Sequence, residues 1–208
     1  MKLFVMAFSL FLSLGVVAQP RSLADSSFYM VVEDVFDVPH RGLAVVGKVS
    51  TGRVRTGALV HLKGFSERPR ALTVSSVDKY GVTHSSAGPG DNTGLIFARG
   101  VTKADVQRGM VVTDTGFGKL EVLTVAELKL NANAGVTYRD GDMLTLFING
   151  INVPNCELVL PRGETLRPGV KKQVKISFPV HEVLIPNLQI AIMKEYKAIG
   201  SGKIVIAE

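Results

Sequence analysis

The residues of this chain that could carry chemistry are few and scattered. Its four histidines, His40, His61, His84 and His181, stand singly, with no second histidine or carboxylate at the spacing of a metal site or a catalytic pair. The single cysteine, Cys156, can form neither a disulfide nor a cysteine-based zinc site within one chain. No G-x-S-x-G elbow of a serine hydrolase occurs. We therefore expect a protein that is not an enzyme and needs no cofactor.

Two fragments look like parts of a nucleotide site but lack the rest of it. Gly200-Ser201-Gly202-Lys203 resembles the end of a phosphate loop. However, Lys197 stands where that loop needs its first glycine, and Ile204 where it needs serine or threonine. Thr102–Asp105 resembles a guanine-recognition tetrapeptide without the phosphate cradle that would supply the binding. We expect no nucleotide to bind to this chain alone.

Charged residues also gather at two other places. Asp140 and Asp142 flank Gly141, which is typical of a turn rather than of an acid–base pair. Five basic residues lie close together around two turns: Arg53, Arg55, Lys63, Arg68 and Arg70. Alternating strand positions place such side chains in water, so a solvated face is the first interpretation and a ligand patch is the alternative.

The first eighteen residues differ in character from the rest. Lys2 is followed by an apolar stretch, Leu3–Val17, and by the small residue Ala18. A basic start, a short apolar middle and small residues before the cleavage point are typical of a secretory signal peptide, and the stretch is shorter than the roughly 20 residues of a membrane span. We expect cleavage after Ala18 and export to the periplasm or envelope. The alternatives are an uncleaved membrane anchor and a cytoplasmic protein.

Composition places the chain among folded globular proteins. Its 208 residues include 24 Lys and Arg and 18 Asp and Glu, and 46% of them are hydrophobic. Intrinsic disorder requires lower hydrophobicity and higher charge. Twenty-one glycines and nine prolines indicate many turns, which is typical of an all-β protein. The formal charge of +6 is spread over both halves of the chain, so it does not by itself indicate binding to nucleic acid.

Short apolar runs rich in β-branched residues recur about every ten residues from Phe28 onward, for example at Leu43–Val49 and Leu72–Val77. Glycine separates them at turns, which is the pattern of a sandwich or barrel. One helical turn is expected at Thr102–Gln107, with Thr102 as its cap. The polar, glycine-rich segment 114–118 divides the runs into two groups. We expect an N-terminal segment (1–18), a linker (19–27), a first β domain (28–113), a second linker (114–118) and a second β domain (119–208).

Four segments of the first group resemble the second domain of the elongation factor Tu and elongation factor 1-alpha family, and they occur in the family's order. They are FYMVVEDVFDVPHRG at Phe28–Gly42, VVGKVSTGRVRTG at Val45–Gly57, AGPGDNTG at Ala87–Gly94 and RGVTKADVQRGMV at Arg99–Val111. A weaker similarity to the family's third domain lies in ELVLPRGETLRPG at Glu157–Gly169 and AIMKEYKAIGSGKI at Ala191–Ile204. The resemblance implies two antiparallel β-barrels without the GTPase domain that precedes them in the family, and a last hairpin that closes the second barrel.

The resemblance also implies a place for the aminoacylated end of tRNA. In the family, an acidic residue that follows a valine contacts the terminal adenosine. The matching residue is Asp78, which is one methylene shorter than the family's usual glutamate. Arg99 lies in the family's Arg-Gly turn, where it would face phosphate.

The second domain departs from the family where it would touch the tRNA stem. Gly135–Tyr138 replaces a Gly-Arg-His-Thr-Pro segment, and losing basic contacts lowers affinity for phosphate. Our first hypothesis is therefore a non-catalytic, exported module that binds a macromolecule, in the simplest case a protein, through barrel surfaces. The second hypothesis is a cytoplasmic translation protein that binds aminoacyl-tRNA or pairs with a separate GTP-binding domain.

Overall fold

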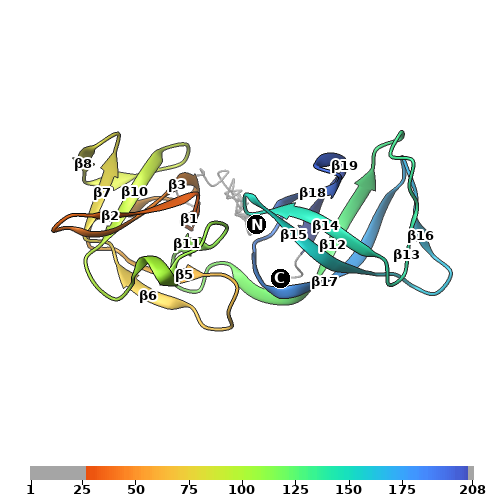
Figure 1. Ribbon diagram of the computed structural model, residues 1–208, viewed down its shortest axis with the longest axis horizontal. Helices are drawn as coiled ribbons and strands as arrows, with labels where there is room; N and C mark the ends of the chain where they lie inside the picture. Colours follow the sequence, from red (N-terminus) through yellow and green to blue (C-terminus); the bar gives the residue numbers. More distant parts are fainter. Residues whose placement is uncertain (1–26, 206–208) are drawn as a thin grey trace, which may run out of the picture.

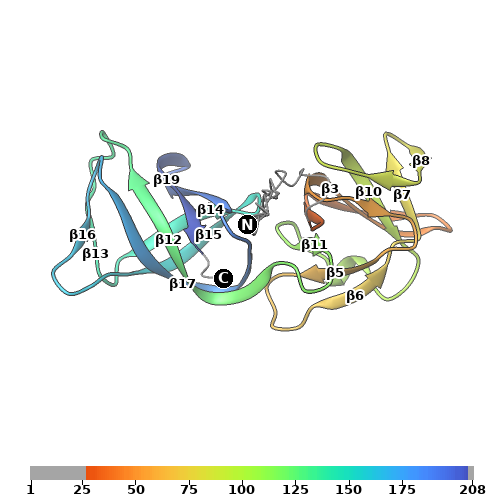
Figure 2. The same cartoon turned by 180° about the vertical axis from the view of Figure 1, so that it is seen from behind.

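The computed structural model describes residues 27–205, and Figures 1 and 2 show two β domains side by side. Within that range the only helix is a single 3₁₀ turn, η2 (Lys103–Asp105), at the place where a helical turn is predicted. The prediction of an all-β fold is therefore confirmed. No helix within residues 27–205 is long and apolar enough to cross a membrane. The signal-like segment 1–18 and linker residues 19–26 lie outside the described residues.

Nine strands of the first domain form one antiparallel sheet in the order β6-β5-β11-β1-β3-β10-β7-β8, with β2 also paired to β3. Their bounds are β1 Tyr29–Val31, β2 Asp34–Val38, β3 Gly42–Thr51, β5 Leu59–Lys63, β6 Arg70–Thr73, β7 Ser76–Lys79, β8 Val82–His84, β10 Asn92–Phe97 and β11 Val111–Thr113. Two short strands, β4 (Val54–Arg55) and β9 (Ser86–Ala87), pair with each other. The sheet curves round a buried core that includes Phe28, Val45 and Leu95.

The predicted strand Leu72–Val77 is wrong, because the chain turns a corner within it. Leu72 belongs to β6 and Val77 to β7, and the two strands are not paired with each other. Between them, Val74 N donates to Ala58 O (2.9 Å) and Ser75 N donates to Ile96 O (2.8 Å), so neighbouring amides bond to different strands. The hydrogen-bonded path of the sheet therefore stays open, with β6 and β8 at its edges, where a closed barrel is predicted.

The second domain is a closed antiparallel barrel in the order β12-β17-β15-β14-β18-β19, with β19 paired back to β12. Its strands are β12 Lys119–Leu130, β14 Met143–Ile148, β15 Ile151–Val159, β17 Lys171–Leu184, β18 Gln189–Lys194 and β19 Lys197–Val205. A separate ladder of β13 (Tyr138–Arg139) and β16 (Thr165–Leu166) lies at the end of the barrel farthest from the first domain (Figure 1). Inward side chains alternate along each long strand and fill the barrel with aliphatic residues.

The fragment that looks like a phosphate loop lies in β19 and closes the barrel. Gly202 pairs with Leu128, and Gly200 pairs with Leu130 of β12. A Cβ atom on Gly202 would overlap the carbonyl oxygen of Glu127, and one on Gly200 would lie 2.7 Å from the carbonyl oxygen of Lys129. The glycines are therefore required by the close approach of two strands, and the motif has a structural role.

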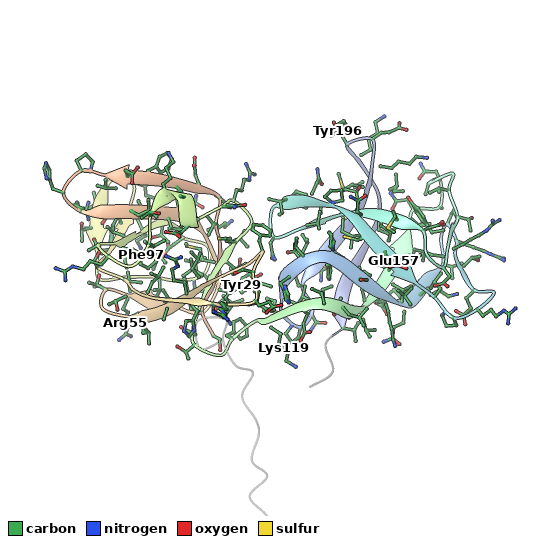
Figure 3. The ribbon with its side chains drawn as sticks, turned by 60° about the horizontal axis from the view of Figure 1, so that its bottom comes forward. Tyr29, Arg55, Phe97, Lys119, Glu157 and Tyr196 are labelled. Carbon is green, nitrogen blue, oxygen red and sulfur yellow. The ribbon has the colours of Figure 1, made fainter. Side chains whose placement is uncertain are left out.

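The two domains meet through a small interface that we call the interdomain interface. Its buried apolar centre comprises Tyr29, Val111 and Val183, with Val31, Phe117, Leu120 and Ile185 packed around them. The rings of Tyr29 and Phe117 meet edge to face at 6.2 Å between centroids. Figure 3 shows Tyr29 on the side of the first domain that faces the second.

Hydrogen bonds cross the same interface. The Tyr29 hydroxyl donates across it to Asn149 Oδ1 (2.7 Å), and within the second domain Asn149 Nδ2 donates to Val183 O (3.1 Å). A backbone bond from Phe65 N to His181 O (3.0 Å) joins the two domains at a second point. The interface therefore combines apolar packing with directional polar contacts.

Packing in the barrel predicts unequal effects for two leucines on the same strand. Leu128 of β12 is fully buried, whereas Leu123 of the same strand is 51% exposed. We expect Leu128→Ala to lower the free energy of unfolding by about 2 to 5 kcal/mol, because it leaves a cavity in a packed core. We expect Leu123→Ala to change it by less than about 0.5 kcal/mol.

Urea unfolding followed by circular dichroism measures both free energies. A similar loss of stability in the two variants would contradict the register of β12 described here.

Candidate binding surfaces

Asp78, the residue matched to the family's tRNA contact, lies in β7 and is held by an ion pair. Arg41 Nη1 donates to Asp78 Oδ2 (2.7 Å), and Arg41 Nη2 donates to Asp78 Oδ1 (2.9 Å). The hydroxyls of Ser76 and Thr83 donate to the same Oδ1 at 2.8 and 3.0 Å. The hydrogen bond from Arg41 and those from the two hydroxyls hold the pKa of Asp78 below its usual value.

Local backbone geometry places Arg41 over β7. The turn between β2 and β3 passes through His40 at φ 60° and Gly42 at φ 111°. A Cβ atom on Gly42 would overlap the carbonyl oxygen of Phe97, so only glycine lets the turn lie against β10. Because β10 pairs with β7, the turn brings the guanidinium of Arg41 to the carboxylate of Asp78.

This ion pair changes what Asp78 can do. Its side chain is 16% exposed, and both carboxylate oxygens already accept hydrogen bonds. A hydroxyl or amino group of a ligand would have to displace Arg41, which is a bidentate partner and therefore a strong one. The geometry makes Asp78 a structural group that joins the β2–β3 turn to β7.

Beside the turn lies an open depression of about 620 Å³, within the size range of small-ligand sites. Its lining includes Pro39, His40, Leu43, Phe97, Val101 and Lys103. Arg99 lies in the exposed turn after β10 and is not among the lining residues. Asp78 pairs with Gly94 in the middle of β10, whereas Arg99 lies beyond the end of that strand, so Asp78 and Arg99 do not form one site.

The five basic residues do not form one patch, and the prediction that Lys63 belongs to a basic surface is wrong. Lys63 is buried, and its Nζ donates to the carbonyl oxygens of Phe117 (2.6 Å) and Gly118 (2.9 Å). Alternation along β5 gives Lys63 the outward side, but the segment that leads into the second domain covers that side. Burial lowers the pKa of Lys63. Its role is to fix the connection between the domains.

The other four basic residues have different surroundings. Arg53 donates to Ser86 Oγ (3.2 Å). Arg70 pairs with Asp105 (2.8 Å) and donates to Gly100 O (3.0 Å). Arg55 and Arg68 are exposed. Solvated or locally paired side chains account for all four without a ligand.

The second domain carries a larger cleft that the sequence did not reveal. It measures about 690 Å³ and is lined by Val136, Tyr138, Met143, Thr145, Asn152, Pro154, Met193, Lys194, Glu195 and Tyr196. We call it the Tyr196 cleft. Two of its apolar residues are open to solvent, Met143 at 58% and Tyr196 at 95% exposure. Figure 3 shows Tyr196 at the tip of a hairpin that projects from the domain.

The hairpin between β18 and β19 has an unusual two-residue turn. Glu195 and Tyr196 both have positive φ, at 48° and 65°, between the paired residues Lys194 and Lys197. Such turns ordinarily take Asn-Gly or Gly-Gly, because side chains are strained at positive φ. The Glu-Tyr pair at this turn is the sequence feature that could have indicated the cleft. Strain retained at an exposed tip is typical of functional positions.

The remaining candidate residues have structural roles. Within residues 27–205, no three of the His, Cys, Asp and Glu side chains cluster to hold a metal ion. Asp140 accepts a bond from Leu160 N (2.8 Å) and Asp142 one from Arg139 N, which confirms the turn. Asp105 accepts bonds from the amide and hydroxyl of Thr102 (2.8 and 2.7 Å), so the guanine-like tetrapeptide is the cap of η2.

No protein-family model matches the chain. The relationship to elongation factor Tu therefore stays a hypothesis that rests on the motifs of residues 28–113.

The role of Arg41 predicts the titration of Asp78. In the Arg41→Met variant we expect the pKa of Asp78 to rise toward its usual value, because the largest cause of its lowering is removed. A carboxylate whose pKa is lowered by folding stabilises the fold at pH values above its ordinary pKa. This contribution is lost as the pH falls through the lowered pKa. The variant should therefore lose less stability on acidification than the wild type does.

Carboxyl-carbon NMR from pH 2 to pH 6 measures the titration. Arg70→Met is the matched control, since it removes the partner of Asp105 and should leave Asp78 unchanged. An unchanged Asp78 midpoint in Arg41→Met would refute the assignment.

Proposed function

We propose that this chain is a non-catalytic binding module that holds a protein partner through the Tyr196 cleft. Its two domains resemble the second and third domains of elongation factor Tu, and residues 1–18 direct it out of the cytoplasm. The observation that carries the proposal is the cleft itself, a hollow lined by both apolar and polar residues, with an exposed methionine and an exposed tyrosine at its rim.

The composition of the cleft supports a protein as the partner. Tyrosine and methionine are enriched in protein interfaces, while acidic residues and lysine are depleted there. Tyrosine offers a large contact area at low conformational entropy. Met143 and Met193 are flexible and adapt to the shape of a partner's side chain. Lys194 and Glu195 at the rim carry opposite charges, so the cleft has no single-sign field that would favour a polyanion.

The alternative function is binding of aminoacyl-tRNA, alone or with a separate GTP-binding domain. The depression beside the β2–β3 turn favours it, since Lys103 and His40 line a hollow of suitable size. Against it stands the ion pair that occupies Asp78, together with the missing basic segment at 135–138. Fewer cationic contacts mean less counterion release and weaker binding.

The cleft predicts which surface tyrosine matters for a protein partner. We expect the double variant Tyr196→Ser, Met143→Ser to weaken binding at least tenfold, because truncation of an aromatic hot-spot residue typically costs about 2 kcal/mol or more. Tyr80→Ser is the matched control: Tyr80 is 88% exposed but lies in the first domain, after β7. Partners are found by quantitative cross-linking in the native source, and their affinities are then measured with purified proteins.

Equal loss of binding in Tyr80→Ser, or none in the double variant, would place the partner elsewhere. All three side chains lie at the surface, so neither variant is expected to disturb folding.

Binding of aminoacyl-tRNA is expected to be weak and to depend little on salt, because few cationic contacts release few counterions. A fluorescence titration at two salt concentrations measures the affinity and its salt slope. Submicromolar, salt-dependent binding that disappears in Lys103→Ala would favour the alternative function over the first.

A further inference from the structure

A buried carboxyl group without a hydrogen-bond partner lies where the two domains meet. Glu182 of β17 is 1% exposed, and its Oε1 accepts no hydrogen bond from any described residue. No ion pair to Glu182 exists within residues 27–205. Burying an ionised carboxylate without a partner is strongly unfavourable, whereas a protonated carboxyl is far easier to bury.

The backbone of Glu182 lies beside the interdomain interface. The preceding residue, His181, accepts the backbone bond from Phe65 of the first domain, and the next residue, Val183, belongs to the apolar centre of the interface. The charge of Glu182 contributes to raising the pKa of Tyr29, which comes from the first domain, and of Cys156, which lies inside the barrel. By strand alternation the side chain of Glu182 lies on the face of β17 that it shares with Leu184 of the barrel core, and its electrostatic effect on Tyr29 shows that the first domain lies nearby.

The titratable neighbours offer no compensation. Across the β12–β17 ladder, Glu121 lies directly opposite Glu182, and it has the same charge. Tyr29 of β1 and Cys156 of β15 have raised pKa values and are neutral at physiological pH. Two cations belong to neighbouring elements: Lys63 donates to the carbonyl oxygens of residues 117 and 118, and Lys119 pairs in register with Leu184.

The neutral polar side chains near the interface form no hydrogen bond with Glu182 either. Asn149 bonds to Tyr29 and to the carbonyl of Val183. Thr113 of β11, which pairs in register with Tyr29, has a buried hydroxyl that accepts and donates no bond within the described residues. Glu182 and Thr113 carry the two buried side-chain atoms of residues 27–205 that lack a partner.

We propose that the interdomain interface is a pH-dependent switch: it is closed while Glu182 is protonated, and ionisation of Glu182 favours separation of the two domains. The contacts that oppose separation are few, namely the Tyr29–Asn149 bond, the Phe65–His181 bond and the small apolar cluster. In the open form that we propose, the ionised carboxylate of Glu182 is hydrated, whereas in the closed form it is buried, so ionisation favours the open form.

The direction of the effect follows from proton binding. Burial raises the pKa of Glu182 from its ordinary 4.5 to about 7 in the closed protein. Between these two values the closed form holds a proton that the open form has lost, so raising the pH favours the open form by up to about tenfold per pH unit. Above the higher value both forms are ionised and the ratio stops changing. The full change is about two orders of magnitude.

Single-molecule fluorescence transfer on the full chain tests the switch. Dyes on Arg55→Cys and Arg139→Cys report the distance between the domains, because each residue is exposed on a different domain, while Cys156 is buried. From pH 5 to pH 7 we expect the ratio of open to closed molecules to rise steeply and then to level off. In Glu182→Gln, which mimics the protonated group, we expect a low and pH-independent ratio.

Glu157→Gln is the matched control, since it removes an exposed carboxylate from β15 and should keep the wild-type response. Carboxyl-carbon NMR of the wild type, which does not depend on the variant's folding, should show Glu182 titrating near pH 7. A midpoint near its ordinary value, an open fraction that does not change with pH, or a wild-type response in Glu182→Gln would each overturn the proposal.

Discussion

Hydrogen bonding between a few buried polar groups is the constraint that determines how the two domains sit against each other. Apolar packing is non-directional, so the cluster around Tyr29 and Val183 could be satisfied by more than one orientation. An unpartnered buried polar group costs about 1 to 3 kcal/mol, so the bonds of Asn149 to both domains select one orientation. Lys63 then fixes the connecting segment with two further bonds. Glu182 is the exception, because it is buried there without a partner.

The same distinction between satisfied and unsatisfied groups separates the two candidate surfaces. In the first domain, Arg41 and two hydroxyls donate hydrogen bonds to Asp78. The carboxylate that the family resemblance assigns to tRNA binding therefore has its partners within the fold. In the second domain, a turn with two residues at positive φ leaves the side chain of Tyr196 almost fully exposed to solvent. Strain and exposure at one tip are disadvantages for folding, which is why a binding role explains them better than packing does.

Alternation and turn residues predicted the strands well wherever a strand has one buried and one exposed face. The all-β class followed from such patterns, whereas the barrel-closing role of residues 200–203 was expected from the family resemblance. The failures are residues whose environment comes from distant parts of the chain. Lys63 has the outward position of a solvated lysine, but residues 117 and 118 cover it. Leu72–Val77 reads as one strand because nothing local shows that Val74 and Ser75 bond to different neighbours. Glu182 resembles any strand glutamate, and nothing local shows that the folded protein buries it without a partner.

The proposed location and the proposed switch bear on each other. The interface changes its closed-to-open ratio only between the ordinary pKa of a glutamate and the raised pKa of about 7 for Glu182. A cytoplasm held near neutrality keeps the protein at the upper end of this range, and its steady pH keeps the ratio steady. A protein outside the cytoplasm meets the pH of the surroundings, which crosses the range whenever they acidify. The proposed switch therefore responds more to acidification in the exported protein that we propose than in a cytoplasmic one.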